Sequence, residues 1–152
     1  MCEMKFNVFE NIIEEIIMVY KHDNRPWLIG YSGGKDSTLL VYLTFQAIAR
    51  IPKNERTKKV YIITSDTMVE NPIVKKYMHG SSEKIMEASL EQKLNIESHI
   101  IYPEVHQTFW SRVIGLGYPT PEPPGFRWCT ERLKINPMNK FVDDCIKTNG
   151  EI

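Results

Sequence analysis

The sequence lacks the features that would assign it at once to a membrane or secreted class. None of its 152 residues belongs to an apolar run near the ~20 residues that a membrane-spanning helix needs. The N-terminus shows no basic region followed by an uninterrupted apolar stretch, so no secretory signal is visible. Basic and acidic residues number 19 each, and the resulting net charge of zero gives no global attraction to nucleic acid or membranes.

Cysteine is also scarce, with three residues (Cys2, Cys129 and Cys145) and no Cys-x-x-Cys spacing. A disulfide framework, a zinc ribbon and a local redox pair are therefore not expected, and the cytoplasm is the default location. This chain alone cannot supply the four cysteines of the usual iron–sulfur cluster. With 42% hydrophobic and 25% charged residues, the composition indicates one globular domain over residues 1–152.

What the chain does contain is a glycine-rich turn between an apolar segment (27–31) and a helix-like one (37–43). A strand that feeds a glycine turn at a helix start leaves backbone N–H groups free at the positive end of the helix dipole. The glycines allow positive φ and close approach of a ligand, the lysine supplies a mobile positive charge, and the serines supply hydroxyl donors. The turn reads Ser32-Gly33-Gly34-Lys35-Asp36-Ser37. We predict that it binds phosphate, although an ordinary strand–turn–helix corner is the alternative, and the Walker A spacing is absent.

Apolar periodicity predicts alternating helices and strands. Residues 6–20 form an amphipathic pattern, and β-rich runs at 27–31, 60–64 and 98–102 predict buried strands. Three further helices are expected. One follows the turn at residues 32–37, which we call the glycine loop, and ends before residue 52. The others cover 72–93, with a kink at Gly80, and the region around 139–147. This order predicts an α/β fold, a parallel twisted sheet flanked by helices.

The carboxyl ends of parallel strands meet at one rim, where ligands gather. The glycine loop and the segment Ser65-Asp66-Thr67 are therefore expected at the same rim. Asp36 and Asp66 could share a Mg²⁺ that carries phosphates, because Mg²⁺ takes a few carboxylates together with phosphate oxygens. Asp66 could equally hydrogen-bond a ribose or begin a turn.

Residues 115–125 contain four prolines and three glycines, which predicts a loop. A loop this long in a small domain is typical of a functional lid, with a passive connector as the alternative. Three cations follow it, Arg127, Arg132 and Lys134, and arginine can grip phosphate bidentately. A solvated helix face is the ordinary explanation of such charges. Cys129 lies among them and would become a better nucleophile or metal ligand, although a buried inert cysteine is equally plausible.

Three blocks together resemble the DndC-type proteins of bacterial DNA phosphorothioation, a branch of the phosphoadenosine phosphosulfate (PAPS) reductase family within the N-type ATP pyrophosphatase superfamily. The blocks are residues 32–37, residues 65–72, and residues 108–110 continued by 115–119 and 127–134. The resemblance implies an adenine nucleotide alpha-hydrolase-like (Rossmann-like) fold, hydrolysis of ATP to AMP and pyrophosphate, and sulfur transfer to the DNA backbone. A cysteine desulfurase and other phosphorothioation proteins are the implied partners.

Members of that family are longer and bind an iron–sulfur cluster through cysteines beyond this region. The sequence also ends at Ile152, where an α/β pattern would begin another strand. We therefore interpret the chain as an N-terminal fragment that lacks a last strand and a C-terminal part, with a short natural protein as the alternative. The predicted nucleotide-binding residues are Ser32, Gly33, Gly34, Lys35, Asp36, Ser37, Asp66 and Thr67, and the predicted catalytic residues are Lys35, Arg127, Cys129 and Lys134. A thiol-dependent enzyme of the PAPS reductase type and a non-catalytic nucleotide-sensing module of a larger complex stay open as alternatives.

Overall fold

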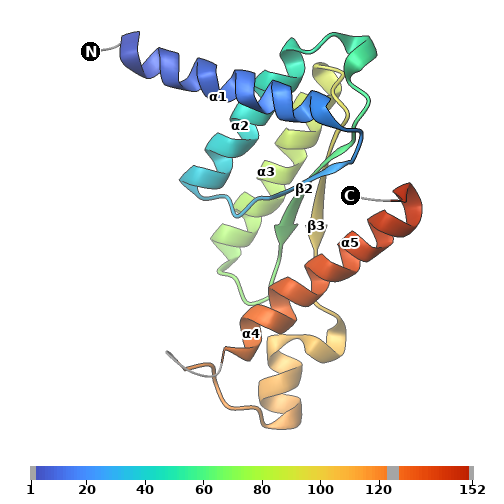
Figure 1. Ribbon diagram of the computed structural model, residues 1–152. Coiled ribbons are helices and arrows are strands. Elements are labelled where there is room, and N and C mark those ends of the chain that lie inside the picture. Colours follow the sequence, from blue (N-terminus) through green and yellow to red (C-terminus); the bar gives the residue numbers. More distant parts are fainter. Residues whose placement is uncertain (1–2, 123–126, 151–152) are drawn as a thin grey trace.

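The structure is a computed structural model that describes residues 3–122 and 127–150 (Figure 1). Its strands are β1 (Trp27–Gly30), β2 (Val60–Ser65) and β3 (Ile96–Ile101). Its α-helices are α1 (Glu3–His22), α2 (Lys35–Arg50), α3 (Pro72–Glu91), α4 (Trp128–Thr130) and α5 (Asn136–Asn149). Short 3₁₀ turns lie at η1 (Lys53–Glu55) and η2 (Val105–Gln107), and π-helical turns lie at η3 (Ser111–Gly115) and η4 (Glu131–Ile135).

The three strands form an open parallel sheet in the order β1-β2-β3. Gly30 at the end of β1 is in register with Ile63 of β2, and Ser65 at the end of β2 is in register with Ile101 of β3. This confirms the predicted α/β class with a parallel sheet flanked by helices. All three strands therefore deliver their carboxyl ends to one rim, which also carries the glycine loop.

Helices cover both faces of the sheet, which explains why β2 is a nearly continuous apolar run. On one face, side chains of α1, α2 and α3 pack against the strands around Ile62 and Ile96. On the other face, Phe141 and Cys145 of α5 pack against Tyr61 and Ile63. Figure 1 shows the same arrangement, with α5 on the opposite side of the sheet from α2.

The amphipathic pattern of the first helix is explained by a second layer. Ile13 of α1 packs against Leu43 and Ala47 of α2, so α1 lies on the outer side of α2 as well as reaching the sheet through Tyr20. The predicted helix over 6–20 is confirmed, and α1 extends a few residues beyond it at each end. The structure does not describe the side chain of Phe6.

The other predicted elements are found with shifted ends. The third strand begins two residues before the predicted 98–102, and α3 runs through Gly80 without the expected interruption. The predicted helix at 139–147 is the end of a longer helical run in which α4, η4 and α5 follow one another from 128 to 149. Of the predicted lid, residues 123–125 lie outside the described part; residues 117–122 are irregular, as expected.

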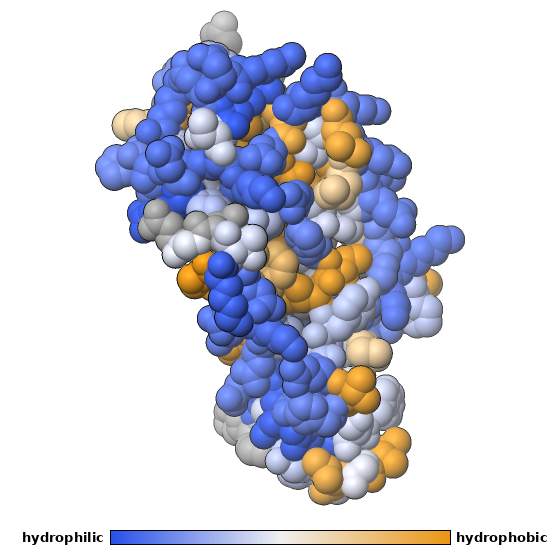
Figure 2. All heavy atoms as spheres, turned by 90° about the vertical axis from the view of Figure 1, so that its right-hand side faces the viewer, coloured by the Kyte–Doolittle hydropathy of each residue, from blue (hydrophilic) through white to orange (hydrophobic). Residues whose placement is uncertain are grey.

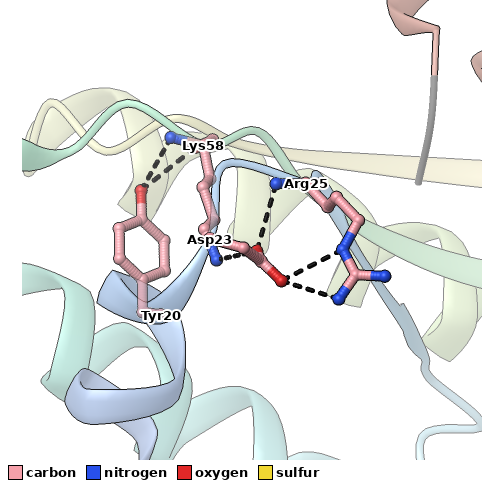
Figure 3. A network of polar contacts seen from close by, with 4 residues as sticks. All are labelled: Tyr20, Asp23, Arg25 and Lys58. Carbon is pink, nitrogen blue, oxygen red and sulfur yellow. Dashed lines mark hydrogen bonds and ion pairs between the residues drawn. The ribbon is translucent and has the colours of Figure 1, made fainter.

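A polar network fixes the start of β1 to the start of β2 (Figure 3). The Lys58 ammonium, whose side chain is 1% exposed, donates to Asp23 at 2.7 Å, and Asp23 also accepts two bonds from the Arg25 guanidinium. The Tyr20 hydroxyl bonds to both the N–H and the carbonyl of Lys58. Because these residues come from α1, the connector to β1 and the segment before β2, the network stabilises the amino end of the sheet, opposite the rim.

None of the described helices is long and apolar enough to cross a membrane. Figure 2 shows a face that is mostly hydrophilic, with apolar side chains gathered at mid-height and at the lower end of the molecule. The segment from η2 to η3, at that lower end, exposes Val105, Ile114 and Leu116.

Candidate functional site

The glycine loop closes on itself through its two serines. The Ser37 hydroxyl accepts from the Ser32 N–H at 3.3 Å and donates to the Gly34 carbonyl at 3.0 Å. The two serine Oγ atoms lie 3.2 Å apart, and the Gly34 N–H donates to Ser32 Oγ at 3.4 Å. Ser37 can reach back because it stands in the first turn of α2. The loop is therefore held in one shape by its own side chains.

Both glycines of the loop have a structural reason. Gly33 has φ +74°, and a Cβ placed there would lie 3.0 Å from Cε1 of Tyr77 on α3. Gly34 is the N-cap residue of α2 and makes no side-chain cap, so the first N–H groups of the helix receive no cap from that position. An uncapped helix start next to a rigid turn is suited to an anion, because free N–H groups and the helix dipole act together. Phosphate binding itself stays a prediction.

Lys35 and Asp36 stand in the first turn of α2 with exposed side chains. Neither makes an ion pair or hydrogen bond to a side chain among the residues that the structure describes. Lys35 is thus free to turn toward an anion at the loop. Asp36 offers an unoccupied carboxylate, which fits a Mg²⁺ that accompanies phosphates.

A cleft of about 360 Å³ opens beside the loop, at the carboxyl ends of β1 and β2. Ser32, Thr64 and Glu70 line it together with Lys134 from η4. A second cavity, of about 270 Å³, is lined by Thr67, Phe109 and Cys129 among others, and it shares Glu70 and Lys134 with the first. We call the two together the rim cavities.

The rim cavities bring together predicted residues that are far apart in sequence. Ser32, Thr67, Cys129 and Lys134 all line them. The fold achieves this because α4 and η4 lead into α5, which packs on the sheet just below the rim. The π-helical turn η4 contains Lys134, and such turns occur frequently at functional sites.

Arg127 is placed differently from Cys129 and Lys134, and like Lys35 it lies outside the two cavities. It flanks the start of α4, is exposed, and does not line either of the rim cavities. Its carbonyl accepts from the Thr130 N–H at 3.2 Å, so its backbone serves the start of the helix. A role for its guanidinium in catalysis stays a prediction.

Asp66 begins a turn, which is one of the three roles left open for it. Its side chain is 0% exposed, and one oxygen accepts from the Met68 N–H at 2.8 Å. The other oxygen faces His79 at 3.4 Å and Lys75 at 3.5 Å. Burial alone would raise the pKa of Asp66, but these three partners outweigh it and hold the pKa below its ordinary value.

Because both oxygens of Asp66 are occupied by protein donors, this carboxylate does not fit a shared Mg²⁺ in the observed conformation, whereas Asp36 does. Among the described residues, no group of three or more histidine, cysteine or acidic side chains is placed to hold a metal ion. A Mg²⁺ at this site would therefore depend on phosphate oxygens and water for most of its ligands.

Thr64 and Glu70 are two of the rim-cavity residues that the sequence analysis did not predict. Thr64 lies at the end of β2, is 1% exposed, and its Oγ1 has no hydrogen-bond partner among the described residues. Glu70 accepts from the Thr67 hydroxyl at 2.9 Å and lines both cavities. A threonine inside a buried strand gives no signal in the sequence, whereas Glu70, four residues after the predicted rim residue Asp66, could have been included.

Comparison with known proteins adds one distant relative. The chain is 26% identical over 141 residues to the Uncharacterized protein MJ0066 of Methanocaldococcus jannaschii. The alignment covers 91% of this chain and 24% of the relative, so the chain spans about a quarter of the length of the curated relative it matches. No family model matches the chain. No solved structure matches it either.

Proposed function

We propose that this chain is an ATP-binding domain of the adenine nucleotide alpha-hydrolase-like class, and that it cleaves ATP to AMP and pyrophosphate in order to activate an acceptor. One observation carries the proposal: the glycine loop, at a helix start without a side-chain cap, lies beside a cleft that Ser32 and Thr64 help to line, and the neighbouring Lys35 has no side-chain partner among the described residues. Free donors around a cleft at the carboxyl rim of a parallel sheet are suited to a nucleotide.

Each part of the site has a role in this proposal. Gly33, Gly34 and Lys35 bind the β- and γ-phosphates, with the Gly34 N–H exchanging its 3.4 Å bond to Ser32 Oγ for a phosphate oxygen. Asp36 holds the Mg²⁺ that accompanies the phosphates. An acceptor oxygen attacks the α-phosphorus, and pyrophosphate leaves. Lys134, which lines both rim cavities, stabilises the charge that develops on the phosphoryl oxygens.

Cys129 extends the proposal to sulfur transfer. It lines the rim cavity that shares Glu70 and Lys134 with the nucleotide cleft, so a sulfur atom carried there would stand close to the activated acceptor. We propose, on the resemblance to DndC-type proteins, that this acceptor is a DNA backbone phosphate and that the outer sulfur of a Cys129 persulfide attacks the phosphorus and displaces AMP. An external thiol then attacks Cys129 Sγ, which frees the phosphorothioate and leaves Cys129 in a mixed disulfide. A cysteine desulfurase is the proposed source of sulfur, the cytoplasm the proposed location, and an iron–sulfur cluster belongs only to a longer form of the protein.

Two other functions remain candidates, each with an observation in its favour. The cysteine beside the cleft would also suit thiol-dependent cleavage of PAPS. The commitment of Asp66 to protein donors leaves a single free carboxylate for Mg²⁺, which favours a module that binds nucleotide without turnover. Calorimetry with ATP and with PAPS would distinguish PAPS cleavage from ATP cleavage, because each function requires tighter binding of its own nucleotide. Nucleotide binding without pyrophosphate release would support the non-catalytic module.

Pyrophosphate release tests the proposal, with the protein in its natural full-length form. Lys35→Ala is expected to abolish ATP-dependent pyrophosphate release. Lys53→Ala is the matched control, since Lys53 is an exposed lysine in η1, beyond the other end of α2. Unchanged pyrophosphate release by Lys35→Ala would contradict the assignment of the glycine loop as the site that binds the ATP phosphates.

A further inference from the structure

Two arginines converge on one neutral acceptor outside the rim cavities. Gln107, at the end of η2, accepts through Oε1 from Arg112 Nη2 at 2.8 Å and from Arg132 Nη1 at 2.6 Å. Arg112 comes from η3 and Arg132 from η4, so the pair also links the segment after β3 to the helix that carries Cys129. Neither arginine lines the rim cavities.

Tyr118 brings the two guanidinium groups still closer. Their Cζ atoms lie 5.2 Å (Arg112) and 5.7 Å (Arg132) from the centroid of its ring. Arg112 Nη1 also donates to the Tyr118 hydroxyl at 3.4 Å. Two like charges are therefore held side by side by an amide oxygen and an aromatic ring, both of which are uncharged.

Within the described residues, the two arginines lack a counter-charge. Neither guanidinium forms an ion pair with a carboxylate of the part of the chain that the structure describes. Arg112 is only 9% exposed, and its Nε is buried without a hydrogen-bond partner among those same residues. Buried charges in proteins are normally paired, because removing a cation from water is costly and two cations repel each other strongly in a medium of low polarity.

We propose that Arg112 and Arg132 form an oxyanion site that binds a phosphate group. Guanidinium is planar and presents its N–H groups as a fork that matches phosphate oxygens, and Arg132 commits only one of its N–H groups to a described residue, Gln107. The phosphate would belong to a small nucleotide or to a nucleic-acid backbone, which have the same chemistry. This site is independent of the glycine loop, so it stands or falls separately from the proposed ATP chemistry.

Inorganic phosphate is the first probe, followed through the Arg112 Nε–Hε resonance by ¹⁵N NMR of the full-length protein. Phosphate is expected to shift this resonance in a saturable way. Arg132→Gln should weaken the binding about tenfold or more, because a charge-assisted hydrogen bond is lost. Arg50→Gln is the matched control, since it removes the same charge from an arginine already paired with Glu10 and should leave the affinity unchanged.

The wild-type titration protects the test against a folding defect of the variant, because it needs no substitution. An Arg112 resonance that phosphate does not move overturns the proposal, as does an equal loss of affinity in Arg132→Gln and Arg50→Gln. Two further titrations identify the source, both in Lys35→Ala so that the glycine loop does not compete. A shift with ATP identifies a nucleotide phosphate, and a shift with a short DNA duplex identifies a backbone phosphate. If inorganic phosphate binds but neither probe does, the site holds an adventitious ion only and the proposal fails.

Discussion

Replacing Gly33 with alanine is expected to lower the free energy of unfolding by about 1–2 kcal/mol. The residue has φ +74°, a conformation that costs an L-amino acid with a Cβ roughly 1–2 kcal/mol. The new Cβ would also lie 3.0 Å from the Tyr77 ring, but that ring is 54% exposed and can move aside, so the contact adds little. With a urea m-value of about 2 kcal/mol/M, the unfolding midpoint should fall by about 0.5–1 M.

Gly34 supplies the matched control for this prediction. Its φ is −78°, and an added Cβ would meet only Ser32 Oγ at 3.4 Å, an ordinary contact. Gly34→Ala should therefore change stability by less than about 1 kcal/mol, since the reduced entropy of the unfolded chain offsets the poorer N-cap that alanine makes. The double variant Gly33→Ala/Tyr77→Ala, compared with Tyr77→Ala alone, isolates the cost of the backbone conformation. Equal unfolding midpoints for Gly33→Ala and Gly34→Ala in urea would contradict the cost assigned to the positive φ at Gly33.

Three further predictions concern stability at the two ends of the sheet. Lys58→Met should lower the free energy of unfolding in urea by about 2–3 kcal/mol. This is less than the loss on breaking a fully buried ion pair, because Asp23 still pairs with Arg25. A loss below about 0.5 kcal/mol would contradict this prediction. Hydrogen bonds from Lys58 and Arg25 hold the pKa of Asp23 well below its usual range, so its contribution is present above about pH 4 and is lost as the pH falls further. Asp23→Asn should accordingly make the loss of stability between pH 5 and pH 2 shallower, and an unchanged slope would count against the network. Thr64→Val should leave the free energy of unfolding unchanged or raise it by up to about 1 kcal/mol, because it removes a buried hydroxyl that has no partner among the described residues. The same variant should bind ATP more weakly in calorimetry. A clear loss of stability would show that the hydroxyl has a protein partner.

Sequence patterns predicted the fold well wherever a local signal decides the element. The strand–glycine–helix order placed β1, the glycine loop and α2 correctly, because a buried parallel strand and a helix start each have their own residue pattern. The continuity of α3 through Gly80 was not predictable in the same way, since a helix tolerates a single glycine when its other residues pack. The π-helical turns η3 and η4 depend on which carbonyl each N–H reaches, and residue type does not encode that choice.

The candidate site shows where sequence reasoning ends. The sequence placed Ser32 and Thr67 at one rim only by assuming the topology, and it did not place Cys129 or Lys134 there. The rim cavities bring all four residues together. Sequence reasoning could not decide among the roles of Asp66, because that choice depends on His79 and Lys75 from the next helix. The sequence also could not predict that Arg112 and Arg132 share an acceptor, since the two arginines are brought together only by the path of the loop between them.

An experimental structure of the full-length protein with ATP and Mg²⁺ would test the proposed nucleotide site most directly. We expect the β- and γ-phosphates to lie within hydrogen-bond distance of the N–H groups at Gly33 and Gly34 and of Lys35 Nζ, with Lys134 facing the α-phosphorus. A nucleotide bound away from the glycine loop, or phosphates that Lys35 does not contact, would contradict this proposal.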